Sequence, residues 1–180
     1  MRPARAEGGG VLTGLDVVRR DGLRVPGRGR IGLLTNNAVV ARDYKSAIEV
    51  VGALPGTSLV RILSPQHGFA GEKQDNMIES GDGVHPSRRV PLVSLYGRVR
   101  EPEPAMLEGI DALVIDLPDV GTRVYTFVNH LVMLLRWLSG RGVEVVVLDR
   151  PNPLNGRDLE GNVARPGHFS IVAQLPVPMR

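Results

Sequence analysis

Polar side chains that suit acid–base chemistry or hydrogen bonding follow five separate apolar runs in this sequence. They are amides, carboxylates, a histidine, a tyrosine and guanidinium groups. The residues of most interest are Asn36, Gln66, His67, Asp116, Asp119, Arg123, Tyr125, Arg150 and Asn152. Together these groups suit a ligand that carries many hydroxyls and an acid group, such as a sugar acid.

The five runs are strand-sized and mostly uninterrupted, which is typical of strands buried on both faces. They are Ile31–Thr35, Leu59–Leu63, Pro91–Tyr96, Ala112–Leu117 and Val143–Leu148. Helical patterns separate them, so the sequence predicts an α/β fold that is Rossmann-like and doubly wound, with a mainly parallel sheet and helices on both faces. Ligands of such sheets bind beyond the carboxyl ends of the strands, where the polar residues lie.

Four helices are expected around this sheet. Thr13 caps a helix that runs through Arg20, and Asp21-Gly22 ends it. Asp43 caps a second helix, which Pro55-Gly56 stops, and Pro104 opens a short third one. The segment Val124–Leu138 is long and apolar, and it predicts a well-buried helix.

The domain organisation is simple. Residues 1–10 are expected to form a disordered leader, and residues 11–180 a single Rossmann-like domain. After Pro151 the chain is rich in proline, asparagine and glycine, which disfavours helix. Residues 171–177 could add a strand, although Pro176 and Pro178 limit its pairing.

Several of the polar residues also have simpler interpretations. His67 serves either the site or a hydrogen bond that fixes its loop. Asp119 serves either the site or a turn with Val120 and Gly121 that begins the helix, near its cap. Tyr125 is a ligand contact or a core residue. Arg123, in the first turn of the expected helix, opposes the helix dipole, which favours a carboxylate partner or ligand. Asn152 lies in a loop that two prolines stiffen.

Other classes of protein receive little support. The net charge is +3, aromatic residues make up 4% of the chain, and no long basic run occurs, so a nucleic-acid partner is disfavoured. No apolar run approaches the roughly 20 residues of a membrane span. The sequence has no cysteine, no glycine-rich dinucleotide or phosphate motif and no compact metal signature, so we expect no cofactor and no metal.

The blocks at the strand ends resemble a known family. They read LLTNNAVV, ILSPQHGFAGEKQDNMIES, VPLVSLYG, DALVIDLPDVGTRVYTFV, VVVLDRPNPLNGRDLEGN and QLPVPMR. In this order they are similar to the peptidoglycan β-N-acetylmuramidase family NamZ, from about Leu12 to Arg180. The resemblance implies a glycoside hydrolase of cell-wall turnover that releases N-acetylmuramic acid from the non-reducing end of peptidoglycan fragments. The expected partner is therefore a muropeptide or amino sugar.

The resemblance also implies two departures. Family members continue beyond PVPMR into a smaller C-terminal domain, which this chain lacks and which is expected to complete the cleft. Many members read Pro-Glu-His-Gly, with the glutamate as the favoured catalytic acid, where this chain has Gln66 before His67. A glutamine cannot transfer the catalytic proton as a carboxyl group does.

Other carboxyl groups could supply the chemistry. Glycoside hydrolysis commonly uses two of them, and the candidates are Glu72, Asp75, Asp116, Asp119 and Asp149. We favour Asp116 or Asp119 as one carboxylate and Glu72 as the substitute acid. Alternatively, the acetamide of the sugar acts as nucleophile, with His67 or Asp119 orienting it. Arg123 and Asn152 would then bind the lactyl carboxylate and the acetamide or hydroxyls, with Asn36, Tyr125 and Arg150 as further contacts.

Two other functions remain open at this point. One is a non-catalytic amino-sugar-binding protein that retains the rim without the acid. The other, on fold analogy alone, is a nucleotide or sugar-phosphate binder. The compartment also stays open, since the N-terminus lacks the apolar segment of a signal peptide. The protein is periplasmic or secreted if a leader was removed, and otherwise cytoplasmic.

Overall fold

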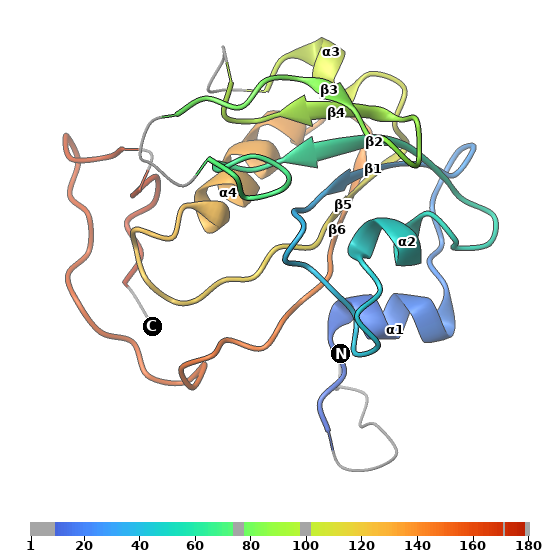
Figure 1. The fold of residues 1–180 in the computed structure, drawn as a ribbon. Coiled ribbons are helices and arrows are strands. Elements are labelled where there is room, and N and C mark those ends of the chain that lie inside the picture. The colour runs from blue at the N-terminus through green and yellow to red at the C-terminus, as the bar shows by residue number, and fades with distance from the viewer. Residues whose placement is uncertain (1–9, 74–77, 98–101, 171, 179–180) are drawn as a thin grey trace.

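The sheet lies at the centre of the molecule (Figure 1). The computed structural model describes residues 10–73, 78–97, 102–170 and 172–178, so most of the expected leader lies outside the described residues. Within them six strands form one sheet in the order β3-β4-β2-β1-β5-β6. The strands are β1 (Arg30–Leu34), β2 (Ser58–Ser64), β3 (Gly83–Val84), β4 (Pro91–Ser94), β5 (Ala112–Ile115) and β6 (Glu144–Val147).

All neighbouring strands are parallel except β3, which pairs with β4 in the antiparallel sense. The predicted parallel α/β fold is therefore confirmed. The two-residue edge strand β3 was not predicted, because its sequence Gly83-Val84 is too short to show a period. The strand expected over Pro91–Tyr96 ends earlier, at Ser94.

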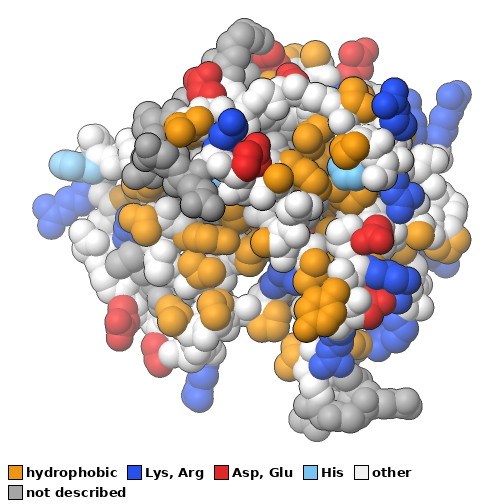
Figure 2. Space-filling view, in the orientation of Figure 1, with side chains coloured by type: hydrophobic (Ala, Val, Ile, Leu, Met, Phe, Trp, Pro, Cys, Tyr) orange, Lys and Arg blue, Asp and Glu red, His pale blue; other side chains and the backbone are white. Residues whose placement is uncertain are grey.

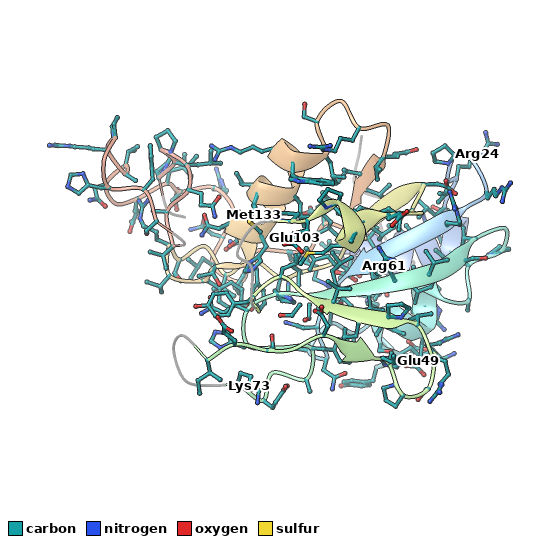
Figure 3. All side chains as sticks on the ribbon, turned by 90° about the horizontal axis from the view of Figure 1, so that it is seen from above. Arg24, Glu49, Arg61, Lys73, Glu103 and Met133 are labelled. Carbon is teal, nitrogen blue, oxygen red and sulfur yellow. The ribbon has the colours of Figure 1, made fainter. Side chains whose placement is uncertain are left out.

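Helices cover both faces of the sheet (Figure 1). On one face α1 (Gly14–Asp21) and α2 (Ala47–Val51) contribute Leu15, Val18, Ile48 and their neighbours to one apolar cluster. On the other face α3 (Pro104–Leu107) and α4 (Phe127–Leu138) form a second cluster with the alternate side chains of the strands. Arg61 of β2, labelled in Figure 3, connects the sheet to α3, because its Nη1 donates to the backbone oxygen of Ala105 at 2.7 Å.

Capping residues begin the two helices of the first face. Thr13 caps α1 as predicted, in a reciprocal capping box with Asp16. The cap predicted for the second helix was wrong: Ser46 caps α2, in a reciprocal capping box with Glu49. The helix ends at Val51, with Gly52 as its C-cap, before Pro55-Gly56. Asp43 instead pairs with Arg19, with 2.6 Å between guanidinium and carboxylate. A serine three residues before a glutamate matched the capping-box pattern better than Asp43 did.

The helix α4 differs from its prediction in start and in burial. It begins at Phe127, three residues later than expected, and Val124 is 75% exposed in the loop before it. Within the helix Leu134 is buried, whereas Val128 and Leu135 are exposed. The expectation of a well-buried helix was wrong, because one side of α4 faces away from the sheet. Arg123 consequently lies in a loop and does not oppose a helix dipole.

The segment after Pro151 runs as an irregular chain along the carboxyl edge of the sheet (Figure 1). In its described part, the strand suggested for residues 171–177 is reduced to an isolated bridge between Ser170 and Ala173, and Ile171 itself lies outside the described residues. Figure 2, in the orientation of Figure 1, shows apolar side chains exposed at several places on the side turned to the viewer. The exposed apolar residues of the segment are Leu154, Leu159, Val163, Phe169 and Val177.

Candidate active site

The loops that follow the strands begin side by side at one edge of the sheet. Backbone bonds continue the ladder one residue past the strands, from Thr35 to Leu63 at 3.1 Å and from Asp116 to Leu34 at 3.0 Å. The loops after β1 and β2 are also joined, since the amide of Asn37 donates to the oxygen of Phe69 at 2.8 Å. The predicted convergence of strand ends on one rim is thus present for the described loops.

The loop after β2 holds Gln66 and His67 in fixed orientations. Gln66 is buried, and its Oε1 accepts a hydrogen bond from the hydroxyl of Thr126 at 2.7 Å. His67 adopts a left-handed backbone conformation with φ of 75°, which is uncommon for a non-glycine residue and marks local strain. Its Nδ1 lies 2.7 Å from the backbone oxygen of Lys73, a residue labelled in Figure 3. Because a carbonyl oxygen only accepts, Nδ1 carries a proton in this contact, and in the neutral ring Nε2 is then the acceptor.

Glu72 lies against the same loop. A Cβ atom placed on Gly68, whose φ is 77°, would stand only 3.0 Å from a carboxylate oxygen of Glu72. The absence of a side chain at Gly68, two residues after Gln66, therefore leaves room for the Glu72 carboxylate. Glu72 is exposed, so its carboxyl group is accessible to a ligand. Asp75, another candidate, lies outside the described residues.

Asp116, after β5, is fully buried and forms a two-point ion pair with Arg150, after β6. The distances are 2.6 Å from Nε to Oδ1 and 3.0 Å from Nη2 to Oδ2. Burial raises the pKa of Asp116, and the hydrogen bonds and charge of Arg150 oppose that effect. The third nitrogen, Nη1, donates to the backbone oxygen of Val40 at 3.2 Å. Both side chains are thus engaged with the protein, which favours a role in positioning the rim.

Asp119 is the more open carboxylate of the two. Its Oδ1 accepts from the amide of Gly121 at 3.1 Å, and it borders two cavities of about 240 and 170 Å³. Tyr125 lies nearby: burial raises the pKa of its hydroxyl, and the negative charge of Asp119 adds to the effect. The bond to Gly121 confirms the simpler interpretation of a turn at Asp119, but this turn does not begin α4, whose N-cap is Thr126. Tyr125 packs on Phe127 with ring centroids 4.7 Å apart.

Arg123 borders the larger of these cavities together with Asp119. Its Nη2 donates to the backbone oxygens of Asn162 and Val177, so it tethers the irregular C-terminal segment to the rim. Only this one of its three nitrogens has a partner among the described residues, which leaves donors for an anionic group.

The two asparagines of the predicted site stabilise turns. Asn36 Oδ1 accepts from the amide of Ala38 at 3.1 Å, and Asn152 Oδ1 accepts from the amide of Leu154 at 2.9 Å. Such turns hold the side chain close to its own backbone. The Nδ2 of Asn152 is buried without a hydrogen-bond partner among the described residues.

Three buried polar residues near α4 were not predicted: Thr126, Asn129 and His130. His130 Nδ1 lies 3.1 Å from the backbone oxygen of Thr126, and burial lowers the pKa of His130 to about 4, so the ring is neutral. Asn129 accepts from the amide of Gln174 at 3.2 Å. The signal for them was present, because an Asn-His pair interrupts the apolar pattern of this helix.

No group of three or more potential metal-ligating side chains occurs among the residues that the structure describes. In the same part of the chain, no helix has the length and apolar character that crossing a membrane requires.

Fold and rim together define an α/β domain of Rossmann type whose candidate site residues follow the carboxyl ends of a mainly parallel sheet. The family model described as exo-β-N-acetylmuramidase NamZ, N-terminal, matches residues 31–180, and the chain belongs to this family. The resemblance noted from the strand-end blocks is thereby confirmed.

Relatives of known sequence or structure agree. The chain is 35% identical over 170 residues to the peptidoglycan β-N-acetylmuramidase NamZ of Bacillus subtilis (strain 168), a match that covers 94% of this chain and 41% of the relative. Two crystal structures of DUF1343 family proteins from Bacteroides fragilis NCTC 9343 are also similar. Their TM-scores are 0.82 and 0.73 at 34% and 27% identity, covering 93% of this chain and 41% and 42% of theirs. The chain thus spans about two fifths of these relatives.

Proposed function

We propose that this chain forms the sugar-binding and catalytic rim of an exo-β-N-acetylmuramidase, which releases N-acetylmuramic acid from the non-reducing end of peptidoglycan fragments. The match of residues 31–180 to the NamZ family carries the proposal. The cluster of Gln66, His67 and Glu72 after β2 supports it, because it offers an amide donor, a ring acceptor and a carboxyl group within one short loop.

In the proposed reaction Glu72 is the general acid that protonates the leaving oxygen. It is the accessible carboxyl group nearest in the loop to Gln66, which lacks a transferable proton. Asp119 orients the acetamide of the sugar, whose oxygen attacks the anomeric carbon in place of a protein nucleophile as the glycosidic C–O bond breaks. Water then attacks the same carbon, the bond to the acetamide oxygen breaks, and the Glu72 carboxylate takes the proton of that water, which releases N-acetylmuramic acid and restores the acid. His67 Nε2, kept free by the Nδ1 bond to Lys73, accepts a hydrogen bond from a sugar hydroxyl or from water.

Substrate binding is assigned to the remaining rim residues. Arg123 pairs with the lactyl carboxylate through the donors that the C-terminal segment leaves free. The amide groups of Asn36 and Asn152 and the hydroxyl of Tyr125 bind sugar hydroxyls. Arg150 acts through Asp116, since the described backbone and that carboxylate occupy its nitrogens. We further propose that a C-terminal domain, in the part of the relatives that this chain does not span, forms the second wall of the cleft.

The test is release of the chromophore from a chromogenic β-N-acetylmuramide, with the Bacillus subtilis relative as positive control. Turnover that disappears in Glu72→Gln supports the proposal. A wild-type chain that binds N-acetylmuramic acid without turnover instead supports the second candidate, a non-catalytic amino-sugar-binding relative. The specific observation in favour of that candidate is Gln66. Its buried side chain is a carboxamide, which cannot serve as a general acid.

A further inference from the structure

One buried hydrogen bond connects the loop after β2 to the start of α4. The hydroxyl of Thr126 donates to Oε1 of Gln66 at 2.7 Å, across a separation of 60 residues in sequence. The side chains of both residues are almost fully enclosed, at 6% and 7% exposure. This contact therefore determines how the carboxamide of Gln66 is oriented.

The bond leaves the two N–H groups of the carboxamide available. Nε2 of Gln66 has no hydrogen-bond partner among the described residues. It also differs from atoms such as Nδ2 of Asn152, which are fully buried without a hydrogen-bond partner. The small exposed part of Gln66, 7% of the residue, is therefore consistent with an Nε2 that is not fully enclosed. The N–H groups of Gln66, rather than its oxygen, are thus the atoms left for a further hydrogen bond.

The hydroxyl of Thr126 is suited to enforcing this orientation. Thr126 occupies the N-cap position of α4, yet its side chain makes no capping bond, so Gln66 Oε1 is the acceptor for its hydrogen. A half-turn of the carboxamide would present NH₂ to the hydroxyl and leave that buried hydrogen without an acceptor, which is unfavourable. Threonine is also stiff about its first side-chain torsion, which limits adjustment.

The backbone of Thr126 is held as well. Its oxygen accepts from Nδ1 of His130 at 3.1 Å, and His130 is neutral because burial lowers its pKa to about 4. The residue is therefore fixed from the helix side while its hydroxyl reaches the loop. A rigid second layer of this kind is what keeps a ligand-contacting group in a productive geometry.

We propose that Thr126 is a positioning residue that acts through Gln66, turning the carboxamide N–H groups toward the bound sugar, where they donate to an oxygen acceptor such as the acetamide carbonyl. This inference rests on the proposed function. Gln66 then acts as a hydrogen-bond donor and not as a proton donor. Thr126 fixes the orientation of the carboxamide that makes this possible.

The experiment compares Thr126→Val, which removes the hydroxyl at nearly constant shape, with Thr126→Ser, which retains it. Each is made in the wild-type chain and in Gln66→Ala, and binding of N-acetylmuramic acid is titrated by calorimetry, with thermal unfolding to verify folding. We expect Thr126→Val to weaken binding about tenfold or more, as the loss of one oriented donor implies. Thr126→Ser should stay within about threefold of wild type. In Gln66→Ala, Thr126→Val should have no further effect.

Two results would overturn the inference. One is wild-type affinity in a folded Thr126→Val protein. The other is an equal loss of affinity from Thr126→Val in the wild-type and Gln66→Ala chains, because a residue that acts through Gln66 has no effect once that side chain is gone. If the wild-type chain binds no N-acetylmuramic acid, the proposed function fails and the inference fails with it, a result distinct from both of the others.

Discussion

Arg150 and Asp116 form a two-point ion pair between two neighbouring strand ends, with nitrogen–oxygen distances of 2.6 and 3.0 Å. The carboxylate is sealed from solvent and the guanidinium nearly so. Since Arg150 also binds the backbone oxygen of Val40, this pair joins the loops after β1, β5 and β6. The geometry of the rim depends on it.

Asp116→Asn should strongly destabilise the protein. The change leaves the guanidinium of Arg150 buried without a counter-charge, a loss of about 3–5 kcal/mol in the free energy of unfolding. The measurement is urea denaturation. Asp119→Asn is the matched control, because an asparagine oxygen can still accept from Gly121, and it should change stability by less than about 0.5 kcal/mol. Equal stability of the two variants would contradict the assigned role of Asp116.

The buried ring of His130 predicts a pH dependence of stability. Its pKa is lowered from 6.5 to about 4 in the folded protein, so the unfolded chain binds the proton more readily. The contribution of His130 to the free energy of unfolding is therefore fully present above pH 6.5. It is lost as the pH falls toward 4, by up to roughly 3 kcal/mol. Denaturation curves at several pH values should show this slope in the wild type and a reduced slope in His130→Gln. If the free energy of unfolding of His130→Gln depended on pH as steeply as that of the wild type, other titrating groups would be responsible and this prediction would be wrong.

Glu72→Gln should lower kcat on a chromogenic muramide by about 10²-fold or more, as expected for loss of a general acid. Glu108→Gln, an exposed position just after α3, is the control and should leave kcat unchanged. Adding Gln66→Glu to the Glu72→Gln protein should restore part of the turnover, since it places a carboxyl group in the same loop but removes the N–H donors of Gln66. Full activity of Glu72→Gln would remove Glu72 from the mechanism.

A pair of glycines separates backbone strain from the placement of Glu72. Gly68 and Gly71 both have positive φ, of 77° and 70°, so alanine at either position costs about 1 kcal/mol or more in stability. Only at Gly68 would the new Cβ approach the Glu72 carboxylate, whereas the space beside Gly71 is open. We expect similar melting temperatures for the two variants but a loss of turnover in Gly68→Ala alone. Equal turnover would show that the position of Glu72 is unimportant.

Arg123→Gln should weaken binding of N-acetylmuramic acid by about 10- to 100-fold, because a charge-assisted bond to the lactyl carboxylate is lost. Binding of N-acetylglucosamine, which has no lactyl group, should be unaffected. Arg136→Gln is the control: Arg136 also donates to the C-terminal segment, at 3.4 Å to the oxygen of Gln174, but it is not assigned to the rim. Equal losses for both sugars would indicate that Arg123 serves only as a tether.

Much of the fold could be predicted because buried parallel strands are continuous apolar runs, as in Ala112–Ile115, and because the cap at Thr13 follows a local pattern. Elements whose existence or bounds depend on tertiary contacts could not be predicted from the sequence. The edge strand at Gly83-Val84 exists only through pairing with β4, and the late start of α4 leaves Val124 exposed despite its apolar character.

The candidate site shows the same division. That Gln66, Asp116 and Arg150 belong to one rim follows from their positions after strands. Which partner each side chain has does not follow, because the pair of Asp116 with Arg150 and the bond from Thr126 to Gln66 join residues far apart in sequence. Local sequence patterns contain no information on such contacts. These contacts nevertheless decide which carboxylate is accessible to a ligand.

The most direct test of the account is a calorimetric titration of the 180-residue chain with N-acetylmuramic acid and, separately, with N-acetylglucosamine. We predict saturable binding of N-acetylmuramic acid and a preference of at least about tenfold over N-acetylglucosamine, from the pairing of Arg123 with the lactyl carboxylate. Absence of binding to either sugar, with the chain folded, would contradict the assignment of this rim as an amino-sugar site.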